Sequence, residues 1–96
     1  AIICSNDLIA AGVILECQSQ GLHVPGDISV TGYNDTDLAT AFEPSITSVE
    51  TPLDIHAQEV ANAMLAALRD GEPFPKLRLP THLKIRHSTG PVTDTS

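Results

Sequence analysis

Apolar and polar positions along the chain predict strands and helices in alternation. The apolar run at 1–4 predicts a strand, and the segment 8–20 is rich in helix formers and ends before Gly21, a residue type that commonly stops helices. A second apolar run at 28–32 predicts another strand. A strand, a helix and a strand in this order form a βαβ unit, so we expect an α/β fold with parallel strands.

The rest of the chain predicts further elements, which are, in order, a loop or short helix over 36–42, a strand over 46–49, a helix from Pro52 to about Arg69, and short strands over 77–79 and 83–87. Thr51 is expected to cap the second helix, because threonine hydroxyls accept hydrogen bonds from the free N–H groups at a helix start. Val24-Pro25-Gly26-Asp27 is typical of a turn. Residues 90–96 are polar and are predicted to form a disordered tail.

Each strand of the predicted βαβ unit is followed by an Asn-Asp pair, Asn6-Asp7 after the first and Asn34-Asp35 after the second. In open parallel sheets, ligands bind outside the carboxyl ends of the strands, where amides and carboxylates can hydrogen-bond the hydroxyls of a sugar or nucleoside. The alternative is that Asn6 and Asp7 cap the helix and that Asn34 and Asp35 form a turn. The helix start favours the structural role for Asp7, whereas no helix start directly follows Asn34, which favours ligand binding there. Asp35 fits both roles.

Charge and composition narrow the classes of partner. The chain carries 5 basic and 12 acidic residues, for a formal charge of −7, and such a surface repels the phosphates of nucleic acid. With 42% hydrophobic and 18% charged residues the composition is that of a soluble globular protein, and no apolar run reaches the length of a membrane span. Cys4 and Cys17 have no metal or redox spacing and are expected to be buried free thiols in a reducing compartment.

The sequence contains no recognisable motif for catalysis or metal binding. The four histidines, at 23, 56, 82 and 87, show no ligand spacing, and the sequence has no phosphate-binding loop, dinucleotide fingerprint or serine-nucleophile motif. We therefore expect neither an enzyme nor a metal or other cofactor. The chain begins inside an apolar strand, and we expect it to be a piece of a longer protein.

Four segments carry a family resemblance. They are 3–12 with Ser5-Asn6-Asp7, 21–35 with Gly32-Tyr33-Asn34-Asp35, 44–52 with Ile46-Thr47-Ser48-Val49, and 79–89 with Leu83-Lys84-Ile85-Arg86. In this order and spacing, they resemble the LacI/GalR family of bacterial transcriptional regulators, over residues 1–89. The resemblance implies a periplasmic-binding-protein-like (type I) two-lobed effector domain, with a parallel sheet in each lobe, of which this chain is the carboxyl-terminal fragment.

The resemblance also implies a domain division and a function. Residues 1–51 and 81–89 would belong to the carboxyl-terminal lobe, and 52–80 would supply a helix and a strand that return to the amino-terminal lobe. A small-molecule effector, a sugar or a related polar ligand, would bind between the lobes and modulate operator binding by a helix-turn-helix domain that this chain lacks. The protein would be a cytoplasmic homodimer. The alternative is a periplasmic sugar-binding protein of a transport system.

Carried over residue by residue, the resemblance assigns roles to individual positions. Asn6 and Asn34 would contact the effector, and Thr51 and Leu53 would face the cleft. Many family members have Asp at the position of Asn34, and an amide there brings no charge to the effector. The dimer interface would include Leu8, Ala11, Leu15 and Phe42.

Overall fold

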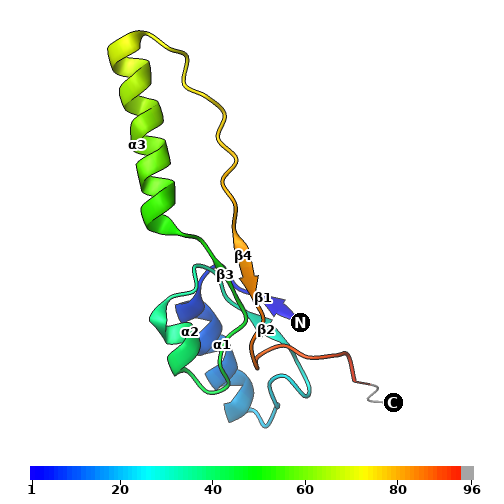
Figure 1. Cartoon of the computed structure of the whole chain (residues 1–96). Helices are drawn as coiled ribbons and strands as arrows, with labels where there is room; N and C mark the ends of the chain where they lie inside the picture. Colours follow the sequence, from blue (N-terminus) through cyan, green and yellow to red (C-terminus); the bar gives the residue numbers. More distant parts are fainter. Residues whose placement is uncertain (94–96) are drawn as a thin grey trace. The chain divides into compact units, whose positions relative to one another are not determined.

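The computed structural model describes residues 1–93, which form two compact units (Figure 1). The first unit comprises Ala1–Glu50 and the segment that begins at His82, and the second comprises Thr51–Thr81. These boundaries lie one residue from those expected for the two lobes. The assignment of the units to lobes of a larger domain remains a prediction.

The first unit begins with the predicted βαβ arrangement. Strand β1 (Ile2–Ile3) pairs in parallel with β2 (Val30–Thr31), with Ile2 opposite Val30, and helix α1 (Asp7–Ser19) connects them. After α1, Gly21 adopts a left-handed conformation (φ 80°), which lets the chain turn toward the 23–27 loop. In that loop the Asp27 N–H donates to the His23 carbonyl at 2.8 Å, which confirms the predicted turn. The pairing of β1 with β2 confirms the predicted parallel orientation of the strands.

The remaining elements of this unit are a short helix and a second two-stranded sheet. The short helix α2 (Asp37–Ala41) lies in the segment where a loop or short helix was predicted, and β3 (Ser48–Glu50) follows. Isolated parallel bridges, Thr31 to Thr47 and Asn34 to Glu50, connect the β2 segment to the β3 segment. Strand β4 (His82–Lys84) pairs with β3 in antiparallel orientation, and Lys84 forms an ion pair with Glu50 at 3.3 Å.

A small apolar core lies between α1 and the strands. Its buried members are Cys4, Ala10, Ala11, Ile14, Val30, Ala39 and Ile46, and Val13, Val24, Leu38 and Phe42 pack against them. Both cysteines are buried free thiols, as predicted, and burial raises the pKa of the Cys4 thiol because desolvation disfavours the thiolate. Tyr33 is exposed, because the chain bends after Gly32.

Helix α3 (Leu53–Asp70) and the extended segment 71–81 form the second unit. Within it, the His56 ring nitrogen Nε2 lies 3.0 Å from the Pro80 carbonyl oxygen. The N-cap position is Pro52, without a side-chain hydrogen bond, so the prediction that Thr51 caps this helix is wrong. The predicted strand at 77–79 is also absent, because no strand among residues 1–93 provides it with ladder hydrogen bonds.

The end of the chain differs in part from the predicted disordered tail. Thr93 Oγ1 donates to the Gly26 carbonyl at 3.0 Å, and the Gly90 N–H donates to Ser29 Oγ at 3.1 Å. Backbone and hydroxyl hydrogen bonds therefore hold 90–93 against the 26–29 segment. The rest of the predicted tail, 94–96, lies outside the described residues.

Candidate functional site

The two Asn-Asp pairs follow neighbouring parallel strands, and a hydrogen bond connects their loops. Asn6 is the N-cap of α1, with its Oδ1 accepting from the Ile9 N–H at 2.8 Å. Its amide Nδ2 has no hydrogen-bond partner among residues 1–93. Asn6 therefore acts as a cap and still has an amide group that can donate to a ligand.

Asn34 is held by its backbone rather than by its side chain. Its N–H donates to the Val49 carbonyl at 2.9 Å, and its φ of 93° is followed by a φ of 54° at Asp35. Two successive non-glycine residues with positive φ are uncommon and persist only where the surroundings hold them. The Asn34 side chain is exposed and makes no hydrogen bond to the described part of the chain. Both its amide donor and its acceptor are open to a ligand.

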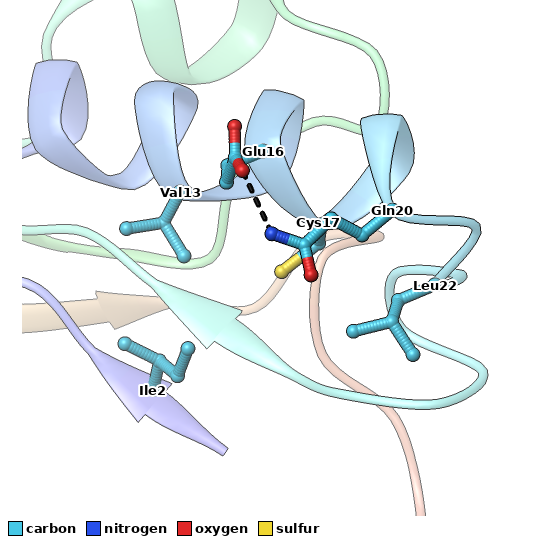
Figure 2. A pocket seen from close by; sticks show the side chains of 6 residues that line it. All are labelled: Ile2, Val13, Glu16, Cys17, Gln20 and Leu22. Carbon is cyan, nitrogen blue, oxygen red and sulfur yellow. Dashed lines mark hydrogen bonds between the residues drawn. The ribbon is translucent and has the colours of Figure 1, made fainter.

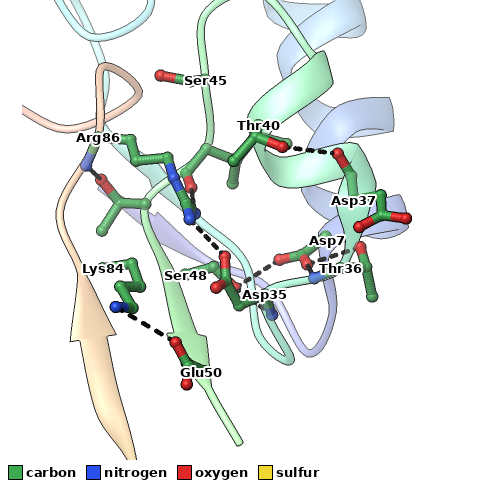
Figure 3. Close-up of polar contacts among 12 residues, drawn as sticks. Asp7, Asp35, Thr36, Asp37, Thr40, Ser45, Ser48, Glu50, Lys84 and Arg86 are labelled. Carbon is green, nitrogen blue, oxygen red and sulfur yellow. Dashed lines mark hydrogen bonds and ion pairs between the residues drawn. The ribbon is translucent and has the colours of Figure 1, made fainter.

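Asp7 lies beneath these loops and is 1% exposed. Its Oδ2 accepts from the N–H of Thr36 at 2.6 Å and from the Thr36 hydroxyl at 2.8 Å, and its Oδ1 accepts from the Ser48 hydroxyl at 2.6 Å (Figure 3). The position at the first turn of α1 adds the favourable field of a helix N-terminus. Three donors therefore satisfy a buried carboxylate that has no ion-pair partner among residues 1–93.

This geometry decides between the roles that the sequence left open for Asp7. The residue that caps α1 is Asn6, so the prediction of Asp7 as the cap is wrong. A ligand contact by Asp7 is not available either, because burial leaves 1% of the residue exposed and both oxygens have donors. The carboxylate instead joins the loop after β1 to the loop after β2.

Asp35 is paired within the same unit. Its Oδ1 lies 2.6 Å from the Arg86 guanidinium, and both side chains are largely buried. Its N–H donates to the Ser48 hydroxyl at 2.9 Å, and Arg86 also donates to the Ile46 carbonyl at 2.9 Å. The Asp35 carboxylate thus secures the loop to the segment after β4, and the effector contact that the sequence left open for it remains a prediction.

Thr51 and Leu53 belong to the second unit, at the start of α3. The Thr51 hydroxyl oxygen is buried and finds no hydrogen-bond partner among the described residues, whereas Leu53 is exposed. Their role in effector binding stays a prediction.

Of the four residues expected in a dimer interface, two lie on an open surface. Leu8 and Leu15 are 74% and 57% exposed on the outer face of α1. Ala11 is 5% exposed and belongs to the core, so it does not lie on this open surface. It lies at the edge of the outer face, where the helix surface turns toward the core. Phe42 is half-buried against the same core.

Sequence reasoning missed Ser48 and Thr36, which provide the donors for Asp7. They lie 41 and 29 positions from Asp7, so no local spacing marks the three as one cluster. Each was compatible with a strand or loop role. Gly32 was the available signal, because a glycine at a strand end often permits close approach of another group.

An apolar pocket lies at the other end of α1 (Figure 2). Its walls are Ile2, Val13, Glu16, Cys17, Gln20 and Leu22. The amide of Gln20 donates to the Glu16 carboxylate at 2.8 Å, so the polar groups of this pocket bond one another. It offers little to orient a polar ligand, and we place the candidate site at the loops that carry Asn6 and Asn34.

Other kinds of site find no support in the described part of the chain. Residues 1–93 contain no group of three or more His, Cys, Asp or Glu side chains that could hold a metal ion. None of the helices described is both long and apolar enough for a membrane span.

Comparison with known proteins places this chain in a family. The model of the periplasmic binding protein-like domain matches residues 1–89. The chain is 36% identical over 76 residues to the HTH-type transcriptional regulator GntR of Escherichia coli. The aligned region covers 79% of this chain and 23% of GntR. Two solved structures are also similar. The CelR–cellobiose complex has a TM-score of 0.81 and 31% identity over 90% of this chain and 27% of that one. The lac repressor dimer bound to operator and the anti-inducer ONPF has a TM-score of 0.83 and 28% identity over 91% and 30%.

The chain belongs to the periplasmic binding protein-like domain family, and the relatives that it matches are LacI-family transcriptional regulators. The α/β fold class and the family expected from the sequence are thereby confirmed. The chain spans about a quarter of the length of the relatives that it matches, 23% of GntR and 27% of CelR.

Proposed function

We propose that this chain is the carboxyl-terminal part of the effector-sensing domain of a LacI-type transcriptional regulator. A small polar effector, in our proposal a sugar, binds between the two lobes of the complete domain. Its binding shifts the relative orientation of the lobes and so changes operator binding by a helix-turn-helix domain elsewhere in the protein. The protein acts in the cytoplasm and has no enzymatic activity.

The observation that carries the proposal is the pair of free amide groups at the carboxyl ends of adjacent parallel strands. Asn6 offers an Nδ2 donor, and Asn34 offers both a donor and an acceptor. Each sugar hydroxyl both donates and accepts a hydrogen bond, and an amide group can do the same. The nearby Asp7 and Asp35 carboxylates are already paired within the chain. This edge therefore favours an uncharged, hydroxyl-rich ligand.

The similarity to GntR, CelR and the lac repressor favours a regulator over the transport alternative. The exposed apolar stripe of α1, with Leu8 and Leu15, supports a homodimer formed through the first unit. A surface of this kind is costly to leave in water and is typical of a subunit interface.

The test is a titration of the intact protein with cellobiose, lactose and D-ribose, followed by the same titration of Asn34→Gly. Glycine removes the amide and tolerates φ 93°, which alanine would not. We expect a sugar to bind the wild type and to bind the variant about tenfold more weakly, as one or two lost hydrogen bonds would cause.

The matched control is Asn62→Ala, which removes an exposed amide from α3. Its affinity and melting temperature should match those of the wild type. Equal affinity of Asn34→Gly and wild type for the bound sugar would contradict the role of Asn34. Release of operator DNA by that sugar, measured by fluorescence anisotropy, tests the regulatory part.

A further inference from the structure

We propose that Asp7 and Ser48 are positioning residues for the effector site, which they hold in its binding geometry without touching the effector. The inference rests on the proposed function, because it concerns the loop that presents Asn34. It starts from the hydrogen bonds around Ser48, a residue that is fully buried.

Ser48 connects the two loops through a single hydroxyl. The hydroxyl donates to Asp7 Oδ1 at 2.6 Å and accepts from the Asp35 N–H at 2.9 Å. The other carboxylate oxygen of Asp7 accepts from the Thr36 N–H at 2.6 Å. The N–H groups of the two residues that follow Asn34 are therefore both fixed by one buried pair (Figure 3).

The conformation that this pair holds is an unfavourable one. Asn34 and Asp35 both have positive φ, 93° and 54°, which side chains with a Cβ rarely adopt. Without the bonds from Asp7 and Ser48, the loop would relax toward ordinary conformations and the Asn34 amide would point elsewhere. The pair thus pre-organises a ligand group, and ligand affinity falls when such a group must be ordered on binding.

Asp7 also fixes the spacing of the two amides. It directly follows Asn6 at the start of α1, so its bonds to Thr36 and Ser48 tie the Asn6 loop to the Asn34 loop. The close approach of Asp7 depends on Gly32, since a Cβ at that position would lie 3.0 Å from the Asp7 Cα and would overlap its carboxylate.

The test compares Ser48→Ala with Ser88→Ala in the intact protein. Ser88 is a matched control, because it is also fully buried and its hydroxyl also makes two hydrogen bonds, from the Thr47 N–H and to the Val30 carbonyl. Those bonds do not involve the 34–36 loop. Both substitutions should lower the melting temperature by a similar amount. If the role of Ser48 were purely structural, the two variants would also have the same loop exchange and the same affinity for the effector.

Two readouts separate the roles. Hydrogen exchange measured by mass spectrometry, without ligand, should speed up at least fivefold in the 33–37 region for Ser48→Ala and stay unchanged there for Ser88→Ala. Titration with cellobiose, lactose and D-ribose should show at least tenfold weaker binding for Ser48→Ala and a change within twofold for Ser88→Ala. Thr36→Val, which removes one partly buried hydroxyl bond to Asp7, should shift both readouts in the same direction by a smaller factor.

Equal exchange in the loop for the two serine variants would overturn the proposal, as would equal affinities. If none of the three sugars binds the wild type, the proposed ligand class fails, and hydrogen exchange alone decides the positioning role. If Ser48→Ala does not fold, Thr36→Val decides it: faster loop exchange supports the proposal, and wild-type exchange refutes it.

Discussion

At the scale of single residues, the most constrained contact is that between Gly32 and Asp7. Gly32 is buried beside the carboxylate, and its lack of a side chain is what allows Asp7 to accept bonds from the far loop. A buried carboxylate is costly unless several donors reach it, and here three do. The stability of the first unit therefore depends on the lack of a side chain at Gly32.

Gly32→Ala should destabilise the protein by about 1–3 kcal/mol, the usual cost of forcing an extra methyl group into a packed site. The matched control is Gly26→Ala, where an added Cβ would lie 3.4 Å from the His23 Cβ, an ordinary contact. Urea unfolding of the intact protein measures both. A Gly32→Ala midpoint equal to that of Gly26→Ala would show that the site can adjust and would contradict the packing argument.

At the scale of elements, α1 has two apolar faces with different roles. One face, with Ala10, Ala11, Ile14 and Cys17, packs in the core. The other carries Leu8, Gly12 and Leu15, spaced four and three residues apart, and all three are exposed. A helix that is apolar nearly all round is typically covered on more than one side, and this pattern supports the homodimer that we propose.

Leu15→Arg in the intact protein should shift the dimer toward monomer, because a guanidinium would be desolvated at the centre of an apolar contact. Sedimentation velocity should show a dissociation constant raised at least tenfold. Gln20→Arg, at the C-cap of the same helix and away from Leu8 and Leu15, serves as the control and should sediment like the wild type. A Leu15→Arg protein that stays dimeric at the same concentration would refute the interface.

At the scale of the whole molecule, the chain divides into a unit with a core and a unit without one. Helix α3 has no buried residue among its 18, although it carries apolar side chains, Ile55, Val60, Met64, Leu65 and Leu68, that are exposed. A helix of this kind gains little from propensity alone and needs tertiary packing. Because the chain spans about a quarter of the length of the relatives that it matches, we expect the rest of the domain, of which we propose that this chain is a part, to cover α3.

The 96-residue chain produced alone should therefore be cleaved by trypsin first within Thr51–Thr81, after Arg69, Lys76 or Arg78. The same sites should be protected in the intact protein, and the isolated chain should bind the apolar dye ANS. Mass spectrometry of early digestion products identifies the cuts. Equal protection of these sites in both proteins would mean that the second unit is stable by itself.

The sequence by itself determined the elements whose cause is local. The apolar runs, the helix formers before Gly21 and the turn residues around Pro25 predicted β1, α1, β2 and the 23–27 turn, since periodicity and turn chemistry act over a few residues. The family resemblance rested on the same local segments, and it led to the correct fold class. The strand at 77–79 could not be judged in this way, because a strand exists only where a partner pairs with it.

Tertiary structure alone decided what Asp7 and Ser48 do and whether Ala11 is buried. Asp7 is compatible with several roles until partners from 29 and 41 positions away are in place, as the bonds that it accepts from Thr36 and Ser48 show. Burial then turns Asp7 from a candidate ligand contact into a support for the loops, and it places Ala11 in the core. Hydrogen bonding and packing at long range are properties of the fold, and no window of sequence contains them.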